Sequence, residues 1–105
     1  MTAVAILAAL FSGLYGVVTR GPTTPVCRVD VPCTKPYGHS TLVFSRLGVT
    51  RRVTTDANGK YRIGLVPGRW SLRVQDAHFG WRPSTVTVPS ARYAKLNVFV
   101  DTGIR

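Results

Sequence analysis

The chain has very few acidic side chains. Its 105 residues contain no Glu and only four Asp, against 14 Lys and Arg, so the formal net charge at pH 7 is +10. Zinc peptidase chemistry requires His and acidic ligands together with a catalytic Glu, and the absence of Glu excludes that chemistry. A positive charge of this size attracts polyanions through its long-range field and through counterion release.

Long runs of basic residues are also missing. The longest is the pair Arg51-Arg52, and the arginines fall mostly at outward positions of the expected strands. A dispersed basic surface is weaker evidence of a polyanion partner than a clustered patch, so two interpretations remain open. One is a genuine anionic partner, such as nucleic acid, an acidic cell-wall polymer or anionic lipid. The other is a solvated strand surface that uses arginine.

Cysteine is limited to Cys27 and Cys33, which lie in a Pro-flanked segment without helix or strand periodicity. In an exported chain the simplest interpretation is one disulfide that closes a short loop, which contributes about 2–3 kcal/mol in the loop-entropy model. A metal site would need further ligands, yet there is no C-x-x-C spacing, and of the two histidines His39 is near and His78 is distant. We therefore predict no metal and no cofactor.

Apolar runs long enough to cross a membrane are absent. The N-terminal run covers residues 3–11 and is followed by Ser12-Gly13, a pattern typical of a signal-peptide core, although no Lys or Arg precedes it. Extended through residue 18 the run reaches 16 residues, fewer than the roughly 20 that a spanning helix needs. We predict that residues 1–13 are a signal peptide or a short apolar segment, and that the domain at 14–105 is extracytoplasmic, secreted or in the cell envelope. Left uncleaved, residues 3–11 would provide a membrane contact.

Helical patterns are absent after residue 13, whereas glycine and proline are frequent. Ten Gly and seven Pro separate short apolar runs, which favours an all-β chain with many turns. A length of 105 residues corresponds to one domain. Short strands at this spacing predict a two-sheet β-sandwich of about seven strands. The expected strands are residues 14–20, 39–45, 49–54, 60–65, 69–75, 84–88 and 93–100.

The clearest pattern lies in residues 55–74. Asp56 and Asn58 can bond their own backbone and Gly59 permits positive φ, so we expect a tight turn before Lys60. The three-residue gap at 66–68 then shifts the alternation of the strands on either side, which requires a bulge or strands in opposite sheets. We predict opposite sheets. The expected inward side chains are Tyr61, Ile63, Leu65, Trp70, Leu72 and Val74.

This segment, with the pattern T-D-x-x-G-x-Y-x-I-x-L-x-P-G-x-W-x-L-x-V, resembles the carboxypeptidase regulatory-like domain, a transthyretin-like (prealbumin-like) β-sandwich. The flanking Pro and Cys residues and residues 101–105 are similar to small exported bacterial members. The resemblance implies a non-enzymatic binding or structural accessory module at the bacterial cell envelope. The matching residues are Thr55, Asp56, Gly59, Tyr61, Ile63, Leu65, Pro67, Gly68, Trp70, Leu72 and Val74.

Catalytic groups do not come together in the expected fold. Transthyretin-fold hydrolases of hydroxyisourate end in Tyr-Arg-Gly-Ser, whereas this chain ends in Thr-Gly-Ile-Arg. A Ser-His-Asp triad would have to draw on Ser40, His39 or His78, and Asp76. Adjacent residues of a strand point to opposite faces, so His39 and Ser40 cannot cooperate. We predict that the protein is not an enzyme and has no catalytic residues.

Two groups of side chains are candidates for binding. The segment His78-Phe79-Gly80-Trp81-Arg82-Pro83 would form an aromatic platform for sugar rings or bases, unless its two rings instead plug the open end of the sandwich. The outward Arg62, Arg69 and Arg73 would form a basic stripe. The expected partner is an envelope protein or an anionic glycan polymer; the alternative is a cytosolic β-sandwich that binds nucleic acid through its arginines. The candidate face is Arg62, Arg69, Arg73, His78, Phe79, Trp81 and Arg82.

Overall fold

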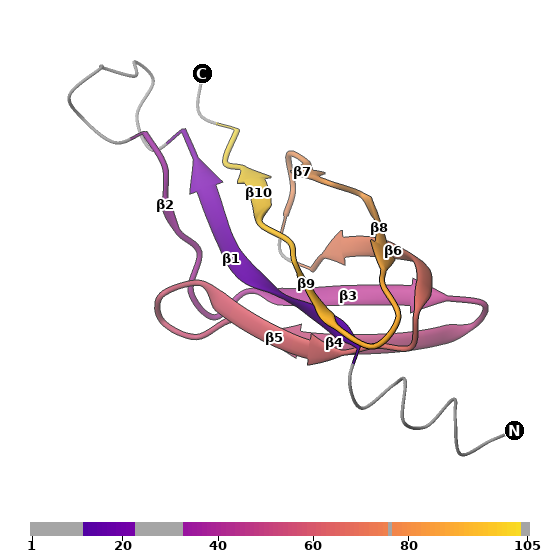
Figure 1. The fold of residues 1–105 in the computed structure, drawn as a ribbon. Helices are drawn as coiled ribbons and strands as arrows, with labels where there is room; N and C mark the ends of the chain where they lie inside the picture. The colour runs from indigo at the N-terminus through magenta and orange to yellow at the C-terminus, as the bar shows by residue number, and fades with distance from the viewer. Residues whose placement is uncertain (1–11, 23–32, 76, 104–105) are drawn as a thin grey trace, which may run out of the picture.

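The computed structural model describes residues 12–22, 33–75 and 77–103, and these residues form strands and no helix. The prediction of an all-β fold is therefore confirmed (Figure 1). The strands are β1 (Gly13–Gly21), β2 (Lys35–Pro36), β3 (Thr41–Arg46), β4 (Val49–Thr54), β5 (Lys60–Gly64), β6 (Gly68–Val74), β7 (Trp81–Arg82), β8 (Thr85–Val88), β9 (Tyr93–Lys95) and β10 (Val98–Asp101).

The strands form two sheets, as expected for a β-sandwich. β1 is the centre of the first sheet: its first half pairs antiparallel with β5 and parallel with β9, and its second half pairs antiparallel with β2 and parallel with β10. β7 follows β10 at the edge. The second sheet has the order β4-β3-β6-β8 and is antiparallel throughout. β5 and β6 therefore lie in opposite sheets, which confirms the prediction made from the gap at 66–68.

The expected number of strands, about seven, is wrong, because the described residues contain ten. β2 and β7 are two residues long, too short for side-chain alternation to be recognised. The predicted strand 93–100 is divided into β9 and β10 at Leu96 and Asn97. The Leu96 carbonyl accepts the Tyr61 hydroxyl at 2.6 Å, and the Asn97 side-chain oxygen accepts the Val17 amide at 3.2 Å. The Leu96 amide still donates to the Tyr15 carbonyl at 2.7 Å, so these side-chain bonds are added where β9 gives way to β10.

The core lies between the sheets and is built from the inward side chains of both. All six inward residues expected in segment 55–74 are buried. Trp70 also satisfies its indole N–H, which donates to the Val66 carbonyl at 2.9 Å. With the inward side chains packed together, the outward ones are presented on opposite sides of the molecule. The core cluster is Leu14, Val18, Leu42, Phe44, Tyr61, Ile63, Leu65, Trp70, Leu72, Val74, Val88, Val98 and Val100.

A tight turn fixes the start of β5. The Asp56 carboxylate accepts the amides of Asn58 and Lys60 at 2.8 and 2.9 Å. Gly59 has a φ of +77°, and a Cβ there would lie 2.5 Å from the Val18 carbonyl oxygen. A side chain at this position is therefore excluded by both conformation and space. The predicted turn is confirmed, and it sets the alternation of β5.

The described fold begins at Ser12. The Ser12 hydroxyl donates to the Leu65 carbonyl at 2.6 Å, and the Leu65 amide donates to the Ser12 carbonyl at 3.0 Å. Ser12 and Gly13 are buried in the sandwich, although the sequence assigned them to the N-terminal segment. Residues 1–11 lie outside the described residues, so a signal peptide there stays a prediction. In the described part of the chain, no helix has the length and apolar character needed to cross a membrane.

Candidate binding surfaces

The seven predicted binding residues lie in three places, two of which meet at a depression of about 260 Å³ that is lined by Phe79, Trp81 and Arg82. Two arginines, on β5 and β7, point outward from the sheet that contains β1. Two more, both on β6, point outward from the other sheet. The remaining three lie between β6 and β8 at one end of the sandwich. The structure therefore does not bring them together as one face. The two arginines on β5 and β7 are Arg62 and Arg82, and the two on β6 are Arg69 and Arg73. The remaining three residues are His78, Phe79 and Trp81.

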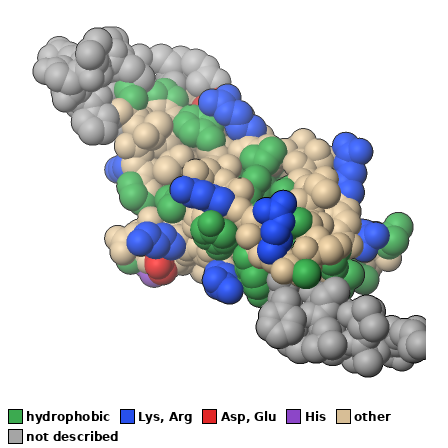
Figure 2. Space-filling view, in the orientation of Figure 1, with side chains coloured by type: hydrophobic (Ala, Val, Ile, Leu, Met, Phe, Trp, Pro, Cys, Tyr) green, Lys and Arg blue, Asp and Glu red, His purple; other side chains and the backbone are tan. Residues whose placement is uncertain are grey.

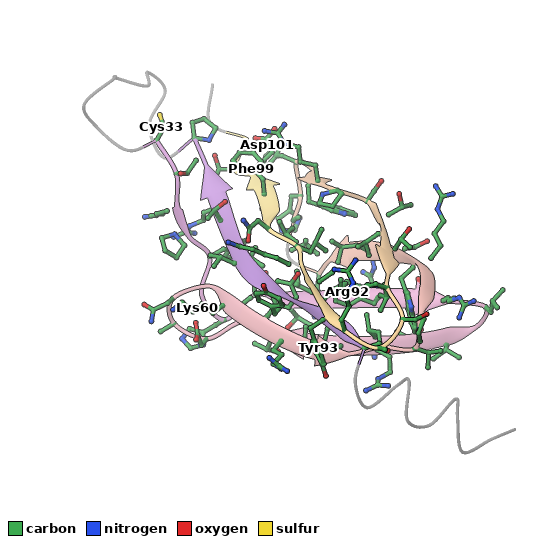
Figure 3. All side chains as sticks on the ribbon, in the orientation of Figure 1. Cys33, Lys60, Arg92, Tyr93, Phe99 and Asp101 are labelled. Atoms are coloured by element: carbon green, nitrogen blue, oxygen red, sulfur yellow. The ribbon has the colours of Figure 1, made fainter. Side chains whose placement is uncertain are left out.

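The outer side of the β1 sheet carries aromatic rings and cations next to one another, and we call it the ring face. Tyr15 lies between Arg62 of β5 and Lys95 of β9 in the register of the sheet. Figure 2 shows Lys and Arg side chains spread among hydrophobic ones on the visible side of the molecule. Figure 3 labels three residues of the ring face: Lys60 of β5, Tyr93 of β9 and Phe99 of β10. The ring face consists of Tyr15, Lys60, Arg62, Arg82, Tyr93, Lys95 and Phe99.

Two arginines of the ring face lie over aromatic rings. The guanidinium carbon of Arg62 is 4.0 Å from the centre of the Tyr93 ring, and that of Arg82 is 4.6 Å from the centre of the Phe99 ring. Such contacts contribute about 0.5–1 kcal/mol at exposed sites. They also hold the planar guanidinium in one orientation, and the N–H groups in its plane can donate to a carboxylate. The ring face thus presents arginines for which one orientation is favoured.

A shallow depression of about 370 Å³ lies beside the Phe99 ring. It combines a ring, a guanidinium, an amide and a hydroxyl, which are the groups that hold a sugar unit by stacking and hydrogen bonding. The Asn97 amide oxygen accepts the Val17 amide, and the amino group of Asn97 is a further hydrogen-bond donor. The lining residues are Thr19, Arg82, Pro83, Asn97, Val98 and Phe99.

The outer side of the β4-β3-β6-β8 sheet carries arginines and hydroxyl side chains, and we call it the hydroxyl face. Arg52 of β4 and Arg73 of β6 lie on either side of Val43 of β3. Arg69 lies opposite Thr87 of β8. Among the described strands of this sheet, no outward residue is aromatic. The hydroxyl face consists of Thr41, Val43, Ser45, Thr50, Arg52, Thr54, Arg69, Ser71, Arg73, Thr85 and Thr87.

The two aromatic residues of segment 78–83 have different environments. Trp81 is half-buried against the core, and its indole N–H donates to the Leu72 carbonyl at 2.9 Å. Phe79 is 61% exposed and, with His78, lines a cavity of about 180 Å³ at the end of β1. Trp81 therefore packs as the plug alternative requires, whereas Phe79 remains at the surface. Both rings nevertheless line one depression of about 260 Å³, together with Arg82, Phe99 and Asp101, so a binding platform here stays a prediction.

Catalytic and metal-binding groups were the other possibility raised by the sequence. Ser40 is buried and His39 is exposed, but both precede β3, and His39 lies in a turn with a φ of +57°, so the expected strand alternation does not apply to this pair. Across the described ranges, no three His, Cys, Asp or Glu side chains are close enough to hold a metal ion. Asp76 and Cys27 lie outside the described residues. Cys33 is not a free cysteine in the structure, and its pairing with Cys27 stays a prediction.

Five residues of the ring face were not among the predicted binding residues. One is Lys60, which alternation in the expected strand 60–65 already placed outward; the other four are Tyr15, Tyr93, Lys95 and Phe99. Their outward positions could have been found from alternation within the expected strands 14–20 and 93–100. Their proximity could not, because it depends on the parallel pairing of β1 with β9 and β10. Such pairings join distant parts of the chain and leave no local signal.

A scan against models of known protein families finds no match, and a search of curated proteins finds none either. The resemblance of segment 55–74 to the carboxypeptidase regulatory-like domain therefore rests on its own residues.

Proposed function

We propose that the protein is a non-enzymatic binding module for an anionic glycan polymer at the bacterial cell envelope, on a transthyretin-like, carboxypeptidase regulatory-like β-sandwich. The ring face carries this proposal. Its arginines are held over aromatic rings, at 4.0 Å for Arg62 on Tyr93 and 4.6 Å for Arg82 on Phe99. Lys60 and Lys95 add charge on the same side. One acidic residue, Asp101 of β10, lies on the same side and lines a depression with Arg82 and Phe99.

An acidic polysaccharide fits both kinds of group. Its carboxylates pair with guanidinium groups, which donate two parallel hydrogen bonds. Its sugar rings pack on exposed aromatic surface such as Tyr15, which is 41% exposed. The apolar N-terminal segment and the two cysteines support a location outside the cytoplasm. In that compartment an envelope glycan, or a protein that presents one, is the abundant polyanion.

The second candidate is a cytosolic module that binds nucleic acid. The interleaved rings and cations of the ring face favour it as well, because bases stack on aromatic side chains while Arg and Lys neutralise phosphate. Compartment distinguishes the two candidates. Intact-mass spectrometry of the native protein from cytoplasmic and envelope fractions tests this: a chain shortened near residue 12 with no reactive thiol supports the glycan, and a full-length cytosolic chain with two thiols supports nucleic acid.

Binding itself is tested with polygalacturonate, a polymer of uronic acid, and with single-stranded DNA as the comparison. The ring-face variant is Arg62→Gln with Arg82→Gln, and we expect its affinity for polygalacturonate to fall about tenfold, or 1.4 kcal/mol. The matched control is Lys35→Gln with Arg51→Gln, which removes the same charge from exposed positions outside both faces. Equal losses in the two double variants would show that only net charge matters and would contradict the proposal.

A further inference from the structure

We infer that the hydroxyl face is a second binding face for the same acidic polysaccharide, so that one molecule cross-links two polymer chains. The inference rests on the proposed function and names a further site for it. It starts from charge. Arg52, Arg69 and Arg73 all point outward from the β4-β3-β6-β8 sheet. The acidic residues of the described chain are Asp56, before β5, and Asp101, on β10, so neither belongs to this face.

The middle of the face is organised around Val43. This residue points outward, yet it is only 4% exposed, and its partners in register are Arg52 on one side and Arg73 on the other. The aliphatic parts of long basic side chains cover apolar surface while the charged ends remain in water. Packing on Val43 therefore holds the two guanidinium groups on either side of it, about 10 Å apart at their strands.

A row of hydroxyl groups runs beside the arginines. Thr50, Ser45, Ser71 and Thr85 are consecutive partners across β4, β3, β6 and β8. Neighbouring strands are about 4.8 Å apart, so the row is about 14 Å long. A depression of about 390 Å³ lies along it. Its lining includes Ser45, Ser71 and Thr85 of the row and Arg69, which adds a cation beside Ser71 on β6. The rest of the lining is Arg46, Leu47 and the nearly buried Trp70.

This chemistry favours an acidic polysaccharide over nucleic acid. Hydroxyl side chains both donate and accept hydrogen bonds, as sugar hydroxyls do, and the arginines supply partners for carboxylates. Single-stranded nucleic acid is bound largely by stacking on aromatic rings, and the described strands present no outward ring on this face.

The two faces are on opposite sides of the sandwich. The sheets are about 10 Å apart, so two anionic chains held on the outer faces are separated by more than the Debye length of about 8 Å at physiological ionic strength. Repulsion between the two polymers is then largely screened. Each molecule can therefore hold two chains at once, and a module with two binding faces gains avidity from a polymer network.

A two-step capture assay tests the inference. The protein is bound to immobilised polygalacturonate, unbound protein is washed away, and capture of a second, fluorescent polygalacturonate chain is measured. The hydroxyl-face variant is Arg52→Gln with Arg73→Gln; Arg69→Gln, opposite Thr87 rather than Val43, serves if the double variant is unstable. We expect the wild type and the Lys35→Gln, Arg51→Gln control to capture the second chain. We expect either face variant to bind the first chain but to lose at least about tenfold of the second capture.

Other results contradict the inference in different ways. Second capture that persists in both single-face variants would show that bridging comes from self-association of the protein. A wild type that binds the first chain and captures no second one would leave the ring face as the binding site and overturn the cross-linking. Absence of binding to the first chain by the wild type would contradict the proposed function as well.

Discussion

Thr55 shows how one buried hydroxyl joins separate parts of the chain. Its side chain is 2% exposed, accepts the Ser40 amide at 2.9 Å and donates to the Tyr37 carbonyl at 2.8 Å. Replacing it with Val keeps the shape and leaves one buried donor and one partly buried acceptor without this partner. We expect Thr55→Val to lower the free energy of unfolding by about 1–3 kcal/mol, measured by urea denaturation.

The neighbouring Thr54 provides the control for this prediction. It is exposed, and its hydroxyl contacts only the Thr41 hydroxyl, at 3.2 Å. Thr54→Val should change the stability by less than about 0.5 kcal/mol, as is usual for surface substitutions. A Thr55→Val variant as stable as Thr54→Val would mean that water replaces the lost partners and that Thr55 does not fasten the segment before the turn.

The buried phenol of Tyr61 makes the stability of the fold depend on pH. Burial raises the pKa of Tyr61 above its ordinary value. The folded state thus holds the phenol proton more tightly than the unfolded state does. The stabilisation that comes from this raised pKa is therefore complete below about pH 10 and is lost as the pH rises above that value. We expect the stability advantage of wild type over Tyr61→Phe to shrink by about 1 kcal/mol between pH 9 and pH 11, followed by urea denaturation. Tyr15→Phe, at an exposed position, should show no such change.

In the turn between β3 and β4, Leu47 has a backbone conformation that is unfavourable for leucine. Leu47 and Gly48 have φ of +48° and +81°, and Leu47 is 89% exposed. Two residues with positive φ form the hairpin turn in which Asn-Gly is preferred. We expect Leu47→Asn to raise the free energy of unfolding by about 0.5–1 kcal/mol because Asn tolerates this conformation. Thermal unfolding measures the change, and Leu47→Ala, which keeps the strain, should give no gain.

Alternation along single strands was predictable because it depends only on neighbouring residues. It correctly placed Tyr61, Leu72 and their inward neighbours in the core, and the shift at 66–68 placed β5 and β6 in different sheets. The same argument already implied that Arg62 and Arg73 point to opposite sides, so the expected single stripe was inconsistent with the predicted sheets. Pairing of β1 with β9 and β10 could not be predicted, and with it most of the ring face was missed.

At the scale of the whole molecule, seven of the 14 Lys and Arg side chains belong to the two faces. If the ring face binds an acidic polymer, each anionic group that it neutralises releases about one counterion, so affinity decreases as salt rises. We expect Arg62→Gln with Arg82→Gln to reduce the slope of log affinity against log salt by up to about two. Affinities for polygalacturonate at several salt concentrations measure the slope. An unchanged slope would mean that neither arginine contacts the polymer.

The parallel pairing of β1 has a mechanical consequence. β1 is bonded in register to β9 at three positions and to β10 at four, so that Gly13 lies beside Tyr93 and Gly21 beside Asp101. A pull applied at Gly13 and at Asp101 is directed along the strands, and it loads this whole seam in shear instead of opening it one bond at a time. A protein held in a tensioned network through these two points would resist extension longest where its first and last described strands meet.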